Sequence, residues 1–292
     1  MKRAHAALFI AIISVSFAAV LIISTEAEPL TIAFYRMLFT TLLISPFFAL
    51  RYYRQELACI THRDLLVLGG IGVILAAHFS FWITSLEYTS VASSVILVTA
   101  HPVLVAPLAY YFFHEKVSRT NVGGIALSLL GVMVLVGGNY NLEAATLEGN
   151  ILAMLGGAAA GVYILGGRQM RHKLSTPVYA LVVYGVATVA LAGIVLVAGA
   201  QLTAIGARNY GLILVMALVP GIFGHTLYNW ALKYVRASVA SVSLLGEPLG
   251  STLLAFALPW ISQVPSWFTV IGGGCILVGI YLASRAVHPE PL

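Results

Sequence analysis

The sequence has few charged residues. Asp, Glu, Lys and Arg make up 9% of its 292 residues, whereas hydrophobic residues make up 60% and the mean hydropathy is +0.98. An ordinary soluble domain carries about 25% charged residues, so this composition excludes that class. Apolar runs of roughly 20 residues, long enough to cross a hydrocarbon core, recur along the chain and leave no room for a soluble domain. The composition therefore predicts an all-α membrane protein.

Cysteine is also scarce, and several catalytic patterns are absent. Cys59 in a short polar stretch and Cys275 inside an apolar run form neither a disulfide framework nor metal-ligand spacing. The chain has no HExxH or GxSxG sequence, and no glycine-rich loop is followed by Lys-Ser or Lys-Thr. We therefore expect no metal, no cofactor, no ATP site and no enzymatic activity.

Acidic residues are outnumbered, since 15 Lys and Arg face 10 Asp and Glu, for a formal net charge of +5. The cations occur in short clusters between apolar runs, which gives no support to nucleic-acid binding. Lys2 and Arg3 precede an apolar stretch, as in a signal peptide. The run from Ala6 to Ser24 is longer than a usual signal core, so we expect a retained first helix.

Polar and proline-containing joints divide the sequence into ten expected membrane-spanning helices. The joints are short, as a compact helical bundle in a bilayer requires. The expected spans are residues 6–24, 30–50, 65–86, 91–113, 120–138, 148–167, 177–199, 209–232, 237–258 and 266–284.

The basic residues of alternate joints indicate the orientation, because cytoplasmic loops carry the excess of Lys and Arg. One side of the predicted topology holds thirteen cations, the other holds Arg208 alone, and Arg36 lies within a span. We therefore expect a multi-pass protein of the inner cell membrane with both termini in the cytoplasm. The thirteen cations are Lys2, Arg3, Arg51, Arg54, Arg63, Lys116, Arg119, Arg168, Arg171, Lys173, Lys233, Arg236 and Arg285, and the opposite side carries Glu26, Glu28, Glu87, Glu143 and Glu148.

The two halves of the sequence match each other. We interpret residues 1–140 and 146–292 as homologous five-helix domains. Because five is odd, the second domain enters the membrane from the opposite side, which makes an inverted five-plus-five repeat typical of secondary transporters. At an offset of 146, Leu86, Tyr88, Pro102, Leu108 and Ala109 match Leu232, Tyr234, Pro248, Leu254 and Ala255, and at 148 Gly124 and Gly131 match Gly272 and Gly279.

Three tracts carry a resemblance to a known family. Residues 238–284, which begin SVASVSLLGEPLG, resemble the closing two helices of the EamA-type family of the drug/metabolite transporter superfamily. Residues 90–135, with Glu115 before a glycine-containing helix, are similar to the matching first-half tract, and PLTIAFYRML at 29–38 resembles the second-helix opening with its arginine. The resemblance implies a ten-helix carrier of small metabolites, often an exporter.

The chain departs from the family pattern at two places. Ser16 and Phe17 stand where the family commonly has Trp-Gly, in a helix that helps to line the cavity of the family. Gln263 stands at the second-half position equivalent to Glu115.

Glu247 is the most conspicuous ionisable residue, because it alone represents Asp, Glu, Lys and Arg between Arg236 and Arg285. At offset 146 it matches His101, and a proline follows each, Pro248 and Pro102. Proline inside a helix removes one backbone hydrogen bond, so we expect both helices to bend there, with these prolines as hinges. An ionisable residue within a span indicates function by default. Glu247 is expected to bind a cationic group or a coupling proton, with an interhelical hydrogen bond as the structural alternative.

The other candidate substrate contacts are polar or aromatic residues inside spans. Arg36 could hold a substrate carboxylate, or extend towards the outer headgroups. Helical spacing places His78 with Trp82, and His225 with Tyr228 and Asn229, on inward faces. His101 is either a proton carrier or a cap for a carbonyl at the bend. The set also includes Tyr163, although Tyr163, Tyr184 and Trp230 are all of a kind more often found in the core or at interfaces. Gly157, Gly161, Gly272, Gly273, Gly274 and Gly279 are expected to pack helices closely.

The sequence favours a secondary transporter of small metabolites such as amino acids, working by alternating access around one central cavity. The expected partners are a small-molecule substrate and the lipid bilayer, with protons as a further candidate. An intramembrane enzyme, a scaffold or receptor and a channel are the alternatives, and the sequence leaves the oligomeric state open.

Overall fold

The computed structural model describes residues 2–89, 91–115, 117–139, 146–203, 205–257 and 266–284, and every regular element in these ranges is a helix. The prediction of an all-α protein is therefore confirmed for this part of the chain. Lys116, Glu143, Gln263 and Arg285 of the sequence predictions lie outside the described residues. The long uninterrupted helices are α1 (Lys2–Ile23), α2 (Pro29–Ile44), α4 (His62–Tyr88), α7 (Arg119–Asn139), α8 (Leu147–Arg171), α9 (Thr176–Ala198) and α14 (Trp267–Ser284).

Three further runs are interrupted helices. α5 (Val91–Thr99) is followed by α6 (Pro102–Phe113), and α12 (Ala237–Ser243) is followed by α13 (Gly246–Ala257). The third run begins with α10 (Ala207–Met216), continues through a π-helical segment, η2 (Ala217–Thr226), and ends with α11 (Leu227–Ala231). Pro220 lies inside η2, where its missing N–H removes one helical hydrogen bond.

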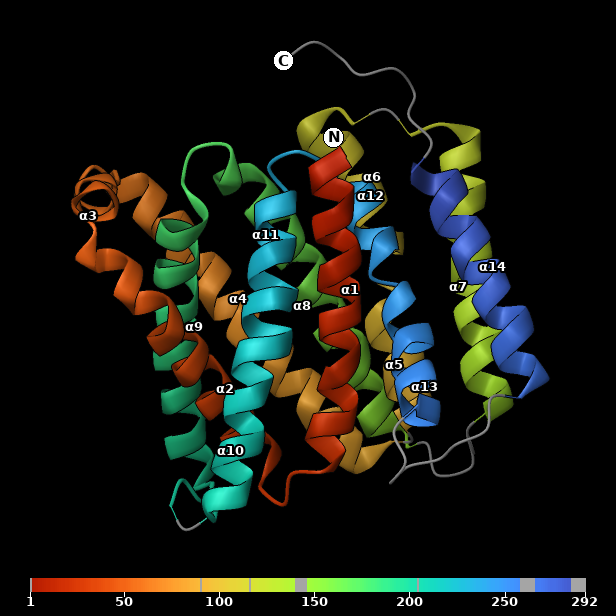
Figure 1. Ribbon diagram of the computed structural model, residues 1–292, viewed down its shortest axis with the longest axis horizontal. Coiled ribbons are helices and arrows are strands. Elements are labelled where there is room, and N and C mark those ends of the chain that lie inside the picture. Colours follow the sequence, from red (N-terminus) through yellow and green to blue (C-terminus); the bar gives the residue numbers. More distant parts are fainter. Residues whose placement is uncertain are drawn as a thin grey trace.

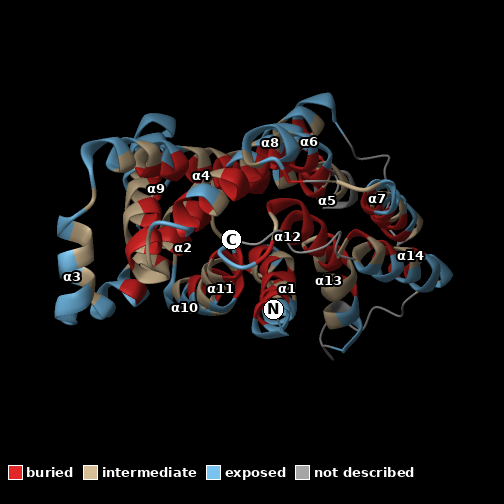
Figure 2. Ribbon diagram, turned by 90° about the horizontal axis from the view of Figure 1, so that it is seen from above, coloured by how far each residue is buried: buried red, intermediate tan, exposed pale blue. Residues whose placement is uncertain are grey.

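In the described ranges, nine helices are long and apolar enough to cross a membrane, and they coincide with nine of the ten expected spans. The remaining expected span, 237–258, corresponds to α12 and α13, each of which is too short to cross a bilayer alone. The expected span 30–50 ends in a 3-10 turn, η1 (Ser45–Ala49), and the connection to α4, where we predicted no helix, contains the short helix α3 (Arg51–Ala58). α3 lies across the axes of the long helices (Figures 1 and 2).

Local sequence explains several helix boundaries. Thr61 caps α4 by accepting a hydrogen bond from the Asp64 N–H at 3.1 Å, and Thr146 caps α8 through the Gly149 N–H at 3.2 Å. Pro29 and Pro102 stand at the start of α2 and α6. The first N–H groups of a helix have no carbonyl partner within it, so a proline there costs no helical hydrogen bond.

The helices form two layers, which Figure 2 shows along the helix axes. One layer contains α9, α4, α8, the α5–α6 pair and α7, and the other contains α2, the α10–α11 run, α1, the α12–α13 pair and α14. α4 packs against α8 and α9, just as the α10–α11 run packs against α1 and α2. α7 and α14 pack together across the layers, and so do α2 and α9.

Contacts between connections define the two ends of the bundle. At one end, called the basic end below, Lys173 Nζ lies 2.7 Å from Asp64 Oδ1, and the Ser175 N–H donates to Glu56. At the other, called the acidic end, the Gln201 N–H donates to Glu28 at 3.2 Å.

Glycines allow α7 and α14 to meet at backbone distance. A methyl group added to Gly131 would lie 2.6 Å from the Gly272 carbonyl oxygen, and one added to Gly124 would lie 2.6 Å from that of Gly279. These four glycines match between the halves of the sequence. Helix association in lipid depends on such close packing because the lipid tails are as apolar as the side chains. Gly274 was also expected to pack, but a methyl group added to it would have no atom of another helix within 4 Å.

Candidate functional site

Two helix interruptions meet near the centre of the molecule. Between α5 and α6, the Ala100 N–H bonds to Leu97 O and the Val103 N–H to Ala100 O, which replaces α-helical hydrogen bonds by tighter three-residue ones. Between α12 and α13, the Leu245 and Glu247 N–H groups make the same kind of bond, to Val242 O and Leu244 O. The first interruption therefore occurs at His101, next to Pro102, and the second, at Leu244 and Leu245, precedes the first turn of α13, which contains Glu247 and Pro248.

His101 lies at the first interruption and connects the two layers. Its Nδ1 and the Ser241 Oγ of α12 are joined by a 2.7 Å hydrogen bond, and both residues are buried. This bond holds the interruption between α5 and α6 against the last turn of α12. Ser241 was not among the predicted site residues, because a serine in an apolar span gives no signal of its own.

A cavity between the layers collects most of the predicted site residues. It reaches from Arg36 on α2 to Glu247 on α13. Three histidines, His78, His101 and His225, reach it from α4, the α5–α6 interruption and η2, and Trp82, Tyr163 and Tyr228 complete its aromatic wall. The remaining lining residues are Val15, Ala18, Val98, Thr99, Ala160, Ile164 and Leu244.

Arg36 is the most buried charged residue of this cavity, with 1% of its surface exposed. Its guanidinium carbon lies 4.7 Å from the centre of the Phe79 ring, and neither Nη1 nor Nη2 has a hydrogen-bond partner among the described residues. The side chain is therefore enclosed by the protein. A guanidinium that keeps free donors towards a cavity can accept a carboxylate in a charge-assisted, two-point contact.

The aromatic wall is held in place by specific contacts. His78 donates from Nδ1 to Gly156 O at 2.9 Å and stacks on Trp82, with ring centres 5.9 Å apart and an interplanar angle of 11°. His225 meets Phe79 edge to face, with ring centres 5.5 Å apart. Within the part of the chain that the structure describes, the buried Trp82 indole N–H and Tyr228 hydroxyl have no hydrogen-bond partner, so both can bond to a ligand.

Asn229 lies behind the wall and is not a lining residue of this cavity. Its Nδ2 donates to the hydroxyls of Tyr163, at 2.5 Å, and Tyr184, at 3.0 Å. Arg171, only 2% exposed, donates from Nε to the Asn229 carbonyl oxygen. Asn229 therefore positions Tyr163. The next residue, Trp230, packs against Tyr234.

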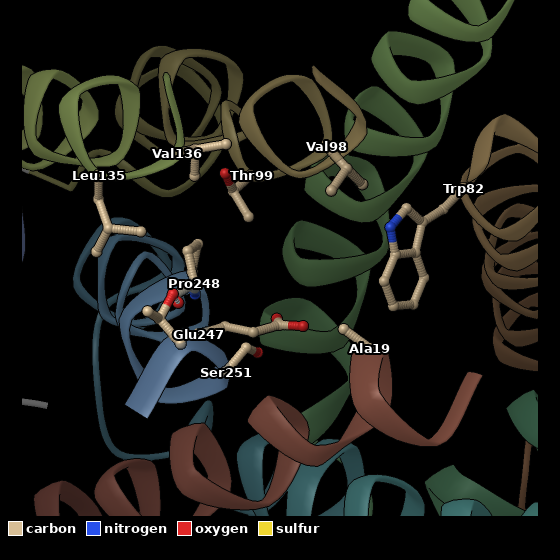
Figure 3. Close-up of a pocket in the computed structure, with 10 residues that line it drawn as sticks. Ala19, Trp82, Val98, Thr99, Leu135, Val136, Glu247, Pro248 and Ser251 are labelled. Carbon is tan, nitrogen blue, oxygen red and sulfur yellow. Dashed lines mark hydrogen bonds between the residues drawn. The ribbon is translucent and has the colours of Figure 1, made fainter. Parts of the chain in front are cut away.

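The carboxylate of Glu247 projects into the space between α1, α4 and α5 (Figure 3). No described residue donates a hydrogen bond to this carboxylate. The Ser16 hydroxyl of α1 contacts the Glu247 carbonyl oxygen at 3.3 Å, and the Ser251 hydroxyl donates to Ser16 O at 2.9 Å. Ser16, which departs from the family pattern, thus joins α1 to α13, while Val15, Ala18 and Ala19 supply the cavity surface of α1.

Glu115, expected to be only a loop residue, is buried at the basic end. Its two carboxylate oxygens accept the backbone N–H groups of Ala237, at 2.9 Å, and Ser238, at 3.3 Å, which begin α12. The Nε of Arg168 lies 3.5 Å from Oε1 of the same carboxylate. A connection of the first half thus caps a helix of the second half.

The cavity combines a positive and a negative pole with an aromatic surface, which suits a small molecule with an amine and a carboxylate. Among the described residues, no group of three or more His, Cys, Asp and Glu side chains is arranged to hold a metal ion.

Comparison with known proteins agrees with a transport role. The sequence pattern described as the EamA-like transporter family matches residues 4–137 and again residues 147–285. The chain is 24% identical to an uncharacterized transporter of Archaeoglobus fulgidus over 90% of each chain, and 23% identical to the uncharacterized transporter YcxC of Bacillus subtilis over 94% of this chain and 90% of the relative.

A third relative has a more specific name. The chain is 26% identical to a probable amino-acid metabolite efflux pump of Salmonella typhimurium, over 75% of this chain and 76% of that protein. One crystal structure, 20% identical, shares the fold with a TM-score of 0.78 and covers 97% of each chain.

Proposed function

Because the chain belongs to the EamA-like transporter family, we propose that it is a secondary transporter that exports small metabolites such as amino acids. The observation that carries the proposal is the cavity between the layers, which Arg36 reaches from α2 and Glu247 from α13. An ionisable group in the centre of a membrane span costs roughly 2.5–3.5 kcal/mol on insertion scales. A zwitterionic substrate offsets part of that cost when it binds.

In the proposed complex, Arg36 holds the substrate carboxylate and Glu247 holds its ammonium group or, in its absence, a proton. Substrate and proton then compete for one carboxylate, which couples their movements. His78, His101, His225, Trp82, Tyr163 and Tyr228 surround the substrate, and Asn229 orients Tyr163.

The proposed topology has ten spans, with α12 and α13 together as the ninth, and two inverted five-helix domains at residues 1–140 and 146–292. The matching neighbours of α4 and of the α10–α11 run support this arrangement. We assign the basic end to the cytoplasm because Lys and Arg are concentrated there. Rocking of the layers about the interruptions at Pro102 and Pro248 then opens the cavity to one side at a time.

The contacts at the basic end support a cytoplasmic gate. α6 packs against α12, His101 bonds to Ser241, and Glu115 caps α12. These contacts join the cytoplasmic halves of the two interrupted helices, so inward opening requires them to separate.

The proposal is tested by efflux of labelled amino acids from proteoliposomes that hold either the wild-type protein or Glu247→Gln, with and without an imposed pH gradient. We expect saturable efflux with counterflow that responds to the gradient in the wild type. The variant keeps the shape of Glu247 but cannot release a proton, so its efflux should lose the response to the gradient.

Other outcomes favour other functions. Flux that neither saturates nor shows counterflow favours a channel, and no flux of any solute favours a scaffold or receptor. Efflux that survives Glu247→Gln unchanged, in a protein that remains folded, contradicts the assigned role of Glu247.

A further inference from the structure

The cavity has a second chamber of different chemistry. Arg36 and three histidines line the chamber described above, whereas Glu247 is the one charged or histidine side chain among the described residues that line the second chamber. The second chamber opens between α5, α7 and α13, and Ala19, Val98, Leu135, Val136 and Pro248 supply its apolar surface. We call the two the polar chamber and the apolar chamber. Leu135 and Val136 are at most 1% exposed, so this surface belongs to the interior rather than to the lipid-facing side.

Glu247 lies at the junction of the two chambers. Together with Trp82, Val98 and Thr99, it lines both of them. Figure 3 shows its carboxylate extending from α13 towards the space bordered by Ala19, Trp82 and Val98. An ammonium group bound there has Arg36 on one side and the apolar chamber on the other.

The hydroxyl groups of the apolar chamber offer little to a polar ligand. Each of the three lining hydroxyls donates to a backbone carbonyl oxygen: Thr99 to Ile96 O at 3.4 Å, Ser251 to Ser16 O at 2.9 Å and Thr252 to Pro248 O at 2.9 Å. Their hydrogens are therefore engaged within the protein. A hydroxyl or amide acceptor that entered the chamber would lose its water without gaining these donors in return.

We propose that the apolar chamber takes the side chain of the substrate, so that the transported class is α-amino acids with branched aliphatic or aromatic side chains. The inference rests on the proposed function, because it assumes that Arg36 and Glu247 hold the α-carboxylate and α-ammonium groups. The carbon that bears both groups then lies near Glu247, and its side chain points into the space between Val98, Leu135 and Val136.

The test is counterflow into proteoliposomes loaded with leucine, with unlabelled amino acids as competitors. The series glycine, alanine, valine, leucine and phenylalanine extends the apolar side chain, and threonine and asparagine replace valine and leucine at similar size. Burial of one methylene group corresponds to about a four-fold gain in affinity. We therefore expect leucine to inhibit at roughly 50-fold lower concentration than alanine, and asparagine to compete no better than alanine.

Two variants of α7 examine the chamber itself. Val136→Phe fills it, so the concentration of leucine or phenylalanine needed for half-inhibition should rise at least ten-fold while that of alanine stays unchanged. Val136→Ala enlarges it and should shift preference towards phenylalanine, which serves as the second test if the larger residue prevents folding. Val134→Phe is the matched control, because Val134 is 37% exposed and lines neither chamber.

The failures of the two proposals are distinguishable. Counterflow with no dependence on side-chain length, or with asparagine equal to leucine, overturns the assignment of the apolar chamber and leaves the transport function intact. Absence of counterflow for every amino acid overturns both proposals.

Discussion

A buried guanidinium with two unpartnered terminal nitrogens is uncommon, because native structures pair nearly all buried polar groups. The face of the Phe79 ring, 4.7 Å away, stabilises part of the positive charge of Arg36, and the side chain lies on the wall of the cavity. Desolvation of a charged group without full compensation is destabilising. The free donors of Arg36 therefore indicate a ligand that completes the site.

Replacement of Arg36 by lysine separates charge from geometry. Lysine keeps the positive charge but cannot form the two parallel hydrogen bonds of a guanidinium with a carboxylate. We expect a loss of about 2 kcal/mol, or roughly thirty-fold in kcat/KM for amino acid efflux. The kcat/KM for efflux of amines that lack the carboxylate should stay unchanged. An equal loss of kcat/KM for amines and amino acids would show that Arg36 stabilises the fold and does not bind the substrate. Arg208→Lys, at an exposed position of the acidic end, serves as control.

At the residue scale, the sequence predicted which side chains face inward better than what each of them contacts. His78 and Trp82 share a face and stack, as their four-residue spacing indicates. Ser241 and Glu115 were missed as structural partners because their roles depend on elements more than 100 positions away, His101 and the start of α12. No local pattern contains such pairings.

At the scale of elements, the glycines of α7 divide into those that meet the backbone of α14 and those that do not, and the match between the sequence halves selects two of the first kind, Gly124 and Gly131. Gly131 faces the backbone of α14, whereas Gly137, on the same helix, has no atom within 4 Å of an added methyl group. Only the first kind is required by packing.

This difference yields a matched pair of variants. Gly131→Ala places a methyl group 2.6 Å from the Gly272 carbonyl oxygen, so α7 and α14 must move apart. We expect a loss of about 1–3 kcal/mol, as for overpacked cores, and a lower midpoint of thermal unfolding in detergent. Gly137→Ala should be neutral or slightly stabilising, because alanine favours helix by up to about 1 kcal/mol over glycine. Equal midpoints for the two variants would contradict the close α7–α14 contact.

The prediction of element boundaries succeeded where apolar runs end at polar joints, and failed where the backbone changes geometry inside a run. The π-helical η2 lies wholly within one apolar run, and only Pro220 marks it. α3 was missed because eight residues with two arginines and a glutamate resemble a connection. Hydropathy reports the environment of a segment, whereas these features depend on backbone hydrogen bonding.

At the scale of the whole molecule, the capping of α12 by Glu115 joins the two halves at the basic end, and in the proposed mechanism it holds that end closed. Two backbone N–H groups of one half bond to two oxygens of a carboxylate from the other half, next to Arg168. Hydrogen bonds to a charged group contribute about 1.5–3 kcal/mol each. In the proposed mechanism, opening of this end must break these hydrogen bonds, so they favour the arrangement in which the cap of α12 is formed.

Glu115→Gln should therefore shift the protein towards the inward-open state. Glutamine has the same shape but only one acceptor oxygen, so its NH₂ group would face one of the two N–H donors of α12. The measurement is the rate at which a membrane-impermeant maleimide labels Leu244→Cys, a cavity residue, in inside-out vesicles after Cys59→Ser and Cys275→Ala. We expect an increase of about ten-fold, since loss of about 1.4 kcal/mol shifts an equilibrium by that factor.

The control is Glu28→Gln, which removes a carboxylate from the acidic end, where it accepts the Gln201 N–H. This variant should leave labelling from the cytoplasmic side unchanged or lower, because it weakens the opposite closure. Native Cys59, exposed just beyond α3 at the basic end, reports the orientation of the vesicles in a parallel sample. If Glu115→Gln leaves the labelling rate unchanged while Cys59 reacts fully, the cap does not restrain opening, and the packing of α6 against α12 alone must close the cytoplasmic side.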